Sequence, residues 1–143
     1  MVIEITESAL MESHKENASK LRELKIQGIK IVIDDFGTGY SSMQHLKGLP
    51  VDIMKIDRSF ITSVSKPGNG GKLTEAIIIL AHRLGMSVVA EGVEEIEQYQ
   101  ILKKYGCDVA QGFLLYEPVP ENKIIKIINK NSSIVMDQMY QNA

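Results

Sequence analysis

The sequence has little of several residue types, and each scarcity excludes a class of protein. Its 143 residues include one cysteine, Cys107, and no tryptophan. One cysteine cannot form an intrachain disulfide or a thiolate zinc cluster, so we expect a small buried side chain in a reducing compartment. The longest apolar run, residues 76–81, is far shorter than the roughly 20 residues of a transmembrane helix. We therefore expect no membrane segment in this chain.

An excess of charge of one sign is also missing. Sixteen Lys and Arg residues nearly balance eighteen Asp and Glu residues, which leaves a net charge of −2. Nucleic-acid-binding domains are usually strongly basic, so we expect no nucleic-acid partner. With 44% hydrophobic and 24% charged residues, the composition is typical of a globular domain.

What the sequence does contain is an alternation of short apolar runs and helical segments. The runs are rich in β-branched residues and nearly continuous, as in strands buried on both faces of a parallel sheet. The expected strands are Val2–Ile5, Ile29–Ile33, Val51–Ile56, Met86–Ala90 and Asp108–Ala110. The expected helices are Asn17–Gln27, Ser41–Lys47, Leu73–Leu84, Glu94–Tyr105 and Pro120–Asn129.

Three of these helices end at a glycine that directly precedes a strand, namely Gly28, Gly85 and Gly106. Glycine readily adopts the left-handed backbone conformation that closes a helix. The recurrence predicts a repeated βα unit with a parallel sheet and right-handed crossovers.

Each expected strand also ends in a charged or amide side chain. Ligands of parallel α/β folds bind at the carboxyl ends of the strands, so we expect these side chains to lie on one rim. The set is Glu4, Asp34, Asp35, Lys55, Asp57, Glu91 and Gln111.

Five carboxylates on one rim repel each other unless a cation binds or some become protonated. Oxygen-only ligands favour Mg²⁺, Mn²⁺ or Ca²⁺, and a pair of such ions suits displacement at phosphorus. Lys55 would then stabilise developing negative charge or orient water, and Glu91 would act as general base if no metal binds it. The alternative is structural, because carboxylates after strands often cap helices or form turns.

The same residues match a known family. The chain resembles the C-terminal part of the EAL domain, the cyclic di-GMP phosphodiesterase domain of bacterial signalling. The resemblance rests on five segments in the family's order, which are Glu4–Ser8, Ile33–Ser42, Leu49–Ile61, Val89–Glu94 and Gln111–Phe113 with Pro118.

The resemblance implies a partial TIM-type α/β barrel with about five of its eight parallel strands. Residues 1–130 would be the C-terminal part of an EAL domain, and residues 131–143 a tail or the extension of a final helix. The complete domain would bind two Mg²⁺ or Mn²⁺ ions and open cyclic di-GMP to linear pGpG.

The resemblance also implies a role for each matching residue. Metal ligands would be Glu4, Asp34, Asp35 and Asp57, and the catalytic residues would be Glu91 and Lys55. Gln111 and Glu94 would contact the substrate. Glu7 would brace the loop that includes Phe36, Gly37, Thr38 and Gly39, which the family links to dimer contacts, so we expect a homodimer.

The chain lacks the Glu-x-Leu motif that names the family, and also the asparagine and arginine that accompany it. We therefore expect a fragment that is inactive by itself, cytoplasmic, from a bacterial protein with a sensory or diguanylate-cyclase-like domain and, in that parent, a potential membrane anchor. The alternatives are a degenerate, non-catalytic EAL-like module and an unrelated Mg²⁺-dependent barrel enzyme of the enolase type.

Overall fold

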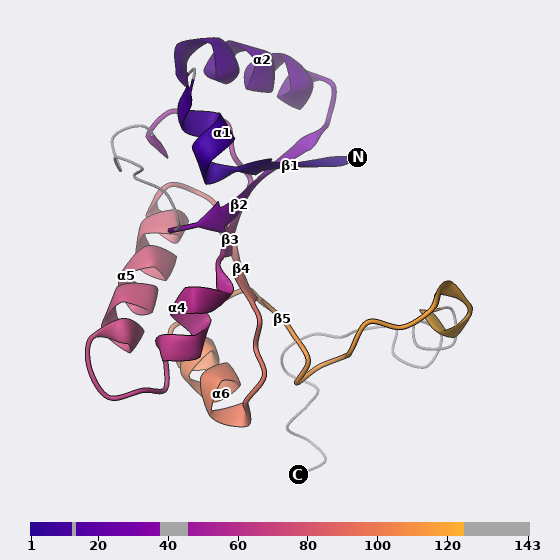
Figure 1. The fold of residues 1–143 in the computed structure, drawn as a ribbon. Coiled ribbons are helices and arrows are strands. Elements are labelled where there is room, and N and C mark those ends of the chain that lie inside the picture. Colours follow the sequence, from indigo (N-terminus) through magenta and orange to yellow (C-terminus); the bar gives the residue numbers. More distant parts are fainter. Residues whose placement is uncertain (13, 38–45, 125–143) are drawn as a thin grey trace.

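The computed structural model describes residues 1–12, 14–37 and 46–124, and these form one parallel sheet with helices packed on it (Figure 1). The strands are β1 (Val2–Thr6), β2 (Lys30–Phe36), β3 (Ile53–Ile56), β4 (Ser87–Glu91) and β5 (Val109–Gln111), in that order across the sheet. The helices are α1 (Glu7–Glu12), α2 (His14–Ile26), α4 (Arg58–Ser63), α5 (Gly70–Arg83) and α6 (Ile96–Lys104). All four strand pairs are parallel, with β1 and β5 at the two edges. The predicted partial α/β barrel is confirmed.

The five predicted strands all form, but several element ends differ from the prediction. β2 continues past Ile33 to Phe36, β3 begins at Ile53, and α6 begins at Ile96. Helices α1 and α4 were not predicted, because six residues are too few to show helical periodicity. Residues 121–124 are helical within the predicted final helix, whereas residues 41–45 and the tail 131–143 lie outside the described residues.

No helix in the described part of the chain is both long and apolar enough to cross a membrane.

The three predicted helix ends are closed by glycine. Gly28, Gly85 and Gly106 have φ angles of 77°, 80° and 79°. At each site the residue after the glycine donates its N–H to the carbonyl five residues back, which closes the helix and starts the next strand. The donor–acceptor pairs are Ile29–Leu24 at 3.2 Å, Met86–Ala81 at 3.0 Å and Cys107–Leu102 at 3.0 Å.

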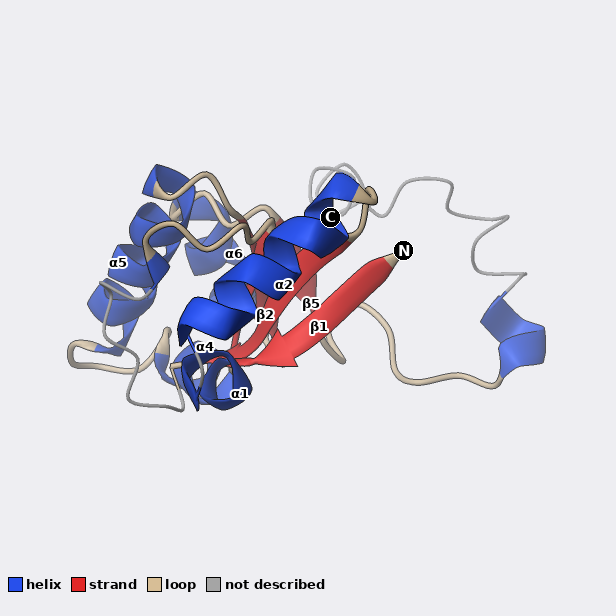
Figure 2. Cartoon of the chain, turned by 90° about the horizontal axis from the view of Figure 1, so that it is seen from above, coloured by secondary structure: helices blue, strands red, loops and turns tan. Residues whose placement is uncertain are grey.

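The helices cover one side of the sheet, where the core lies (Figure 2). On this side Ile31, Met54 and Val88 are 0% exposed, whereas Ile3 and Ile5 of the edge strand β1 are partly buried. On the opposite side, Val89 is only partly buried and Val109 is 47% exposed. Val32 of β2, on this same side, is 3% exposed. The prediction of strands buried on both faces is therefore confirmed at Val32 and wrong at Val109, because helices pack on one face only.

Two aspartates fasten the amino ends of the strands in the same way. Asp52 precedes β3, and its Oδ2 accepts the Ile31 N–H of β2 at 2.9 Å while Oδ1 pairs with Lys25 of α2. Asp108 precedes β5 and makes the same two kinds of contact, one with the neighbouring strand β4 and one with His82 near the end of α5. Its Oδ2 lies 2.7 Å from Val88 N and 2.8 Å from His82 Nε2. Each aspartate thus joins two strands and a helix end.

The Asp52 contacts give the fold a pH dependence. Partial burial opposes ionisation, but the hydrogen bonds from Lys25 and Ile31 outweigh it and hold the pKa of Asp52 below its ordinary value of 3.8. A carboxyl group with a lowered folded-state pKa stabilises the fold above its unfolded pKa, and this stability disappears as pH falls through the folded pKa.

We predict that Asp52→Asn lowers the free energy of unfolding by about 1 kcal/mol at pH 7 and by much less near pH 2. Urea unfolding at the two pH values measures this difference. Glu117→Gln, which alters an exposed carboxyl group, is the control and should change little at either pH. An equal loss at both pH values would contradict the assignment.

Candidate active site

The register of the sheet brings the polar strand ends to the side without helices. Glu4 pairs with Val32 across β1 and β2, Lys55 pairs with Val89 across β3 and β4, and Glu91 pairs with Gln111 across β4 and β5. Side chains two residues apart on a strand share a face. Asp34, two residues after Val32, therefore points to the same side.

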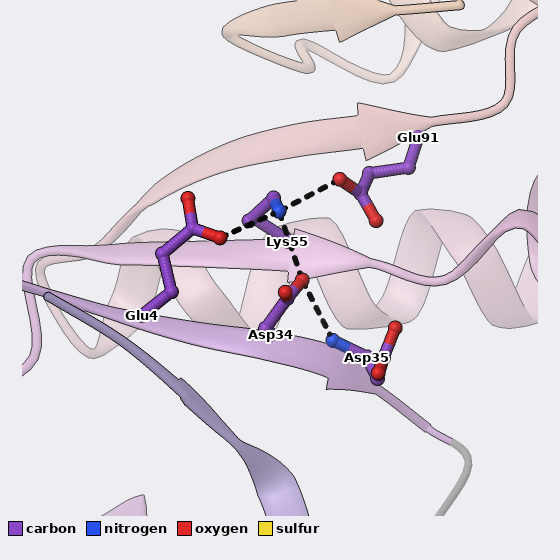
Figure 3. Close-up of polar contacts among 5 residues, drawn as sticks. All are labelled: Glu4, Asp34, Asp35, Lys55 and Glu91. Carbon is purple, nitrogen blue, oxygen red and sulfur yellow. Dashed lines mark hydrogen bonds and ion pairs between the residues drawn. The ribbon is translucent and has the colours of Figure 1, made fainter.

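Lys55 lies at the centre of this group (Figure 3). Its Nζ lies 2.8 Å from Glu91 Oε1, 3.0 Å from Asp34 Oδ1 and 3.2 Å from Glu4 Oε2. The three carboxylates come from β4, β2 and β1, so one ammonium group connects four strands. The Lys55 side chain is only 13% exposed.

The pKa of Lys55 shows how this group is balanced. Burial alone would lower it, but hydrogen bonds to Glu91, Asp34 and Glu4 outweigh the burial and raise the pKa well above its ordinary 10.5. Lys55 therefore stays protonated at any physiological pH and acts as a cation and hydrogen-bond donor, not as a base.

A bulge in β2 brings two consecutive carboxylates to the same side. In a regular strand Asp35 would point toward the helices, opposite to Asp34. Here the register between β2 and β3 shifts between Ile33 and Phe36, and Asp35 has a φ of 54°. The Asp35 N–H donates to Asp34 Oδ1 at 3.0 Å. The bulge re-aims the Asp35 side chain, as bulges beside functional sites often do.

The resulting carboxylates fit a divalent cation. Asp34, Asp35 and Glu91 each offer an oxygen atom, and the three atoms lie within 4.8 Å of one another. Carboxylate oxygens are the donors that Mg²⁺, Mn²⁺ and Ca²⁺ prefer. One lysine cannot neutralise these three groups and Glu4, so an additional cation would be favourable.

The other predicted site residues lie around this centre. Asp57 caps α4, since its Oδ1 accepts the Ser59 N–H at 2.9 Å. Hydrogen bonds from the Ser59 side chain and from backbone N–H groups lower the pKa of Asp57 against the effect of burial. Gln111 at the end of β5 lines an open pocket of about 340 Å³. Glu94 forms an ion pair with Arg58, with 2.8 Å between Oε1 and Nη2.

Glu7 contacts the start of the loop that follows β2. Its side chain is buried, and Oε2 accepts the Gly37 N–H at 2.7 Å. Gly37 has a φ of 102°, and a Cβ there would lie 2.2 Å from the Phe60 ring of α4. Phe36 is buried in the core, whereas Thr38 and Gly39 lie outside the described residues.

The comparisons with known proteins decide the family. The sequence profile of the EAL domain matches residues 1–118. The chain belongs to the EAL domain family. The resemblance seen in the sequence is therefore confirmed, although the match is to part of an EAL domain, as expected for a fragment.

Curated relatives of this EAL chain are considerably longer proteins. It is 40% identical over 125 residues to the bifunctional diguanylate cyclase/cyclic di-GMP phosphodiesterase MucR of Pseudomonas aeruginosa, which covers 87% of the chain and 18% of MucR. It is 42% identical over 118 residues to the cyclic di-GMP phosphodiesterase NbdA of the same organism, covering 82% of the chain and 15% of NbdA. The chain thus spans less than a fifth of either relative.

Two solved structures of c-di-GMP complexes are similar to this chain in fold and in sequence. The PaMucR phosphodiesterase, in complex with c-di-GMP, superposes with a TM-score of 0.81 and 41% identity over 86% of this chain and 50% of that one. A manganese/cy-diGMP complex of Klebsiella pneumoniae BlrP1 superposes with a TM-score of 0.73 and 33% identity over 79% and 29% of the two chains.

Sequence reasoning missed two residues that shape this EAL site. Arg58 follows a predicted site residue and Gln98 lies inside a predicted helix, but neither was assigned a contact. Gln98 Oε1 accepts the backbone N–H groups of Glu94 and Glu95 at 2.9 and 3.1 Å. A glutamine three residues after an acidic helix start is a known capping pattern, so this contact had a sequence signal. The Arg58–Glu94 pair had none.

We predict that Lys55→Met destabilises the fold by about 2 kcal/mol at pH 7, because three carboxylates lose their shared cation. Urea unfolding at pH 7 measures the loss. Lys72→Met, which removes an exposed lysine of α5, is the control. A Lys55→Met variant as stable as the wild type at pH 7 would contradict the central role of this ammonium group.

Proposed function

We propose that this chain is part of a metal-dependent phosphodiesterase domain that hydrolyses cyclic di-GMP to linear pGpG. The observation that carries the proposal is the group of three carboxylates, Asp34, Asp35 and Glu91, beside the protonated Lys55. Its relatives named as cyclic di-GMP phosphodiesterases, and the c-di-GMP complexes among its structural neighbours, support this substrate.

Hydrolysis joins a water oxygen to phosphorus and breaks one phosphodiester P–O bond, while a proton lost by the water is replaced on the departing sugar oxygen, which becomes a hydroxyl group. A divalent cation held by Asp34 and Asp35 would supply Lewis-acid stabilisation of the charge that develops on phosphoryl oxygens. Lys55 Nζ donates hydrogen bonds and keeps its proton, so it orients the water and stabilises negative charge. Glu91, held by Lys55, accepts the proton of the water.

The remaining assignments belong to the same proposal. Glu4 and Asp57 provide further carboxylates to the metals, which we infer to be two Mg²⁺ or Mn²⁺ ions. Gln111 and Glu94 contact the substrate at the ends of β5 and β4. Glu7 holds the loop after β2 through Gly37, and that loop contributes to a homodimer within a larger bacterial signalling protein.

The isolated 143 residues should be nearly inactive, because the Glu-x-Leu motif and its accompanying asparagine and arginine do not occur in them. We therefore predict negligible pGpG when the chain is incubated with cyclic di-GMP and Mn²⁺ and the products are separated by chromatography. Robust turnover by the chain alone would contradict this expectation.

A chimera tests the chemistry itself. Residues 1–118 replace the matching segment of NbdA, which is 42% identical over 118 residues. We predict that the chimera hydrolyses cyclic di-GMP, and that Asp34→Asn or Glu91→Gln lowers its kcat by about 100-fold or more. Glu117→Gln, at an exposed position in the same segment, is the control. A folded chimera that binds cyclic di-GMP without hydrolysing it would instead favour a non-catalytic EAL-like module.

A further inference from the structure

We propose that Arg58 is a positioning residue that fixes Glu91 by holding the loop directly after it, residues 92–95. The proposal rests on the proposed function for its catalytic meaning, but the contacts that carry it are independent of substrate and metal. Arg58 lies three residues after Lys55, at the start of α4. Arg58 therefore reaches the end of β4 from the start of α4, just beyond the end of the strand that carries Lys55.

The first contact is an ion pair. Arg58 Nη2 lies 2.8 Å from Glu94 Oε1, and the two side chains are 61% and 40% exposed. Ion pairs this exposed contribute little to global stability. The main effect of the Arg58–Glu94 ion pair is therefore local, on the orientation of residues 92–95.

The second contact involves the stem of Arg58. Gly92 follows Glu91 directly and has a φ of +71°, and a Cβ there would lie 2.4–2.9 Å from the Cγ, Cβ and Cδ atoms of Arg58. The methylene groups of Arg58 thus lie directly against the backbone of Gly92. Gly92 therefore cannot move toward α4, and this limits the movement of Glu91, the adjacent residue.

Other groups hold the same loop from different directions. The Val93 N–H donates to Gln111 O at 3.0 Å, and the Val93 carbonyl accepts from Leu114 at 3.0 Å. Gln98, 4% exposed, accepts the Glu94 and Glu95 N–H groups. Arg58 supplies the contact on the side of β3, where Glu91 meets Lys55.

Arg58 is itself fixed by its position. Asp57 caps α4 through the Ser59 N–H, which stabilises the first turn of the helix that begins at Arg58. The segment from Lys55 to Arg58 consequently holds Glu91 twice. Lys55 binds its carboxylate at 2.8 Å, and Arg58 holds the backbone that follows it.

The test uses the full chain in NMR experiments without metal or substrate. We expect Arg58→Ala to raise amide hydrogen exchange at Val93 and Glu94 about threefold to fivefold. The ammonium protons of Lys55, whose signal is assigned by its loss in Lys55→Met, should exchange with water faster by a similar factor. Arg58→Lys should restore part of both effects, because it returns the charge and the stem.

Arg83→Ala, which removes an exposed arginine at the end of α5, is the matched control and should leave both signals unchanged. Unaltered exchange at Glu94 and Lys55 in Arg58→Ala would overturn the proposal. So would a uniform increase that includes Ile31 and Val88, since that would show general destabilisation. These signals do not depend on phosphodiesterase activity, so a failure of the proposed function in the chimera would be recognised separately.

Discussion

The parallel register of the five strands is the constraint on which the candidate site depends. Apart from the bulge at Asp35 in β2, neighbouring strands keep their pairing from β1 to β5, so every second residue faces the same side of the sheet. The helices take one side and bury it completely at Ile31 and Met54. The other side is left for the polar strand ends, which explains why Glu4, Lys55 and Glu91 meet although they are distant in the sequence.

Lys55 makes that polar side compatible with a folded protein. Bringing three carboxylates together without a cation would be unfavourable, and one ammonium group on the central strand β3 satisfies all of them. The formal balance is incomplete, since one ammonium group meets three carboxylates. The fold thus tolerates an excess of negative charge at the place where an oxygen-preferring cation would fit best.

Much of this arrangement could be predicted from the sequence, and the exceptions have physical reasons. Gly28, Gly85 and Gly106 marked the helix ends because only a left-handed residue closes them in this way. The polar strand ends marked the rim because parallel strands align their carboxyl ends. The bulge at Asp35 was not predicted, since it depends on pairing with β3. The Arg58–Glu94 pair was not predicted either, since it joins the start of α4 to the loop after β4.

The unpredicted helix α4 connects the two loops that surround the site. Phe60 lies against Gly37, which Glu7 holds after β2, and Arg58 lies against Gly92, which follows Glu91 after β4. Both glycines have positive φ angles, and neither leaves room for a Cβ beside α4. A side chain at either position would have to displace the α4 side chain that faces it, Phe60 at Gly37 or Arg58 at Gly92. The two loops therefore pack against the same short helix, although they share no backbone hydrogen bond among the described residues.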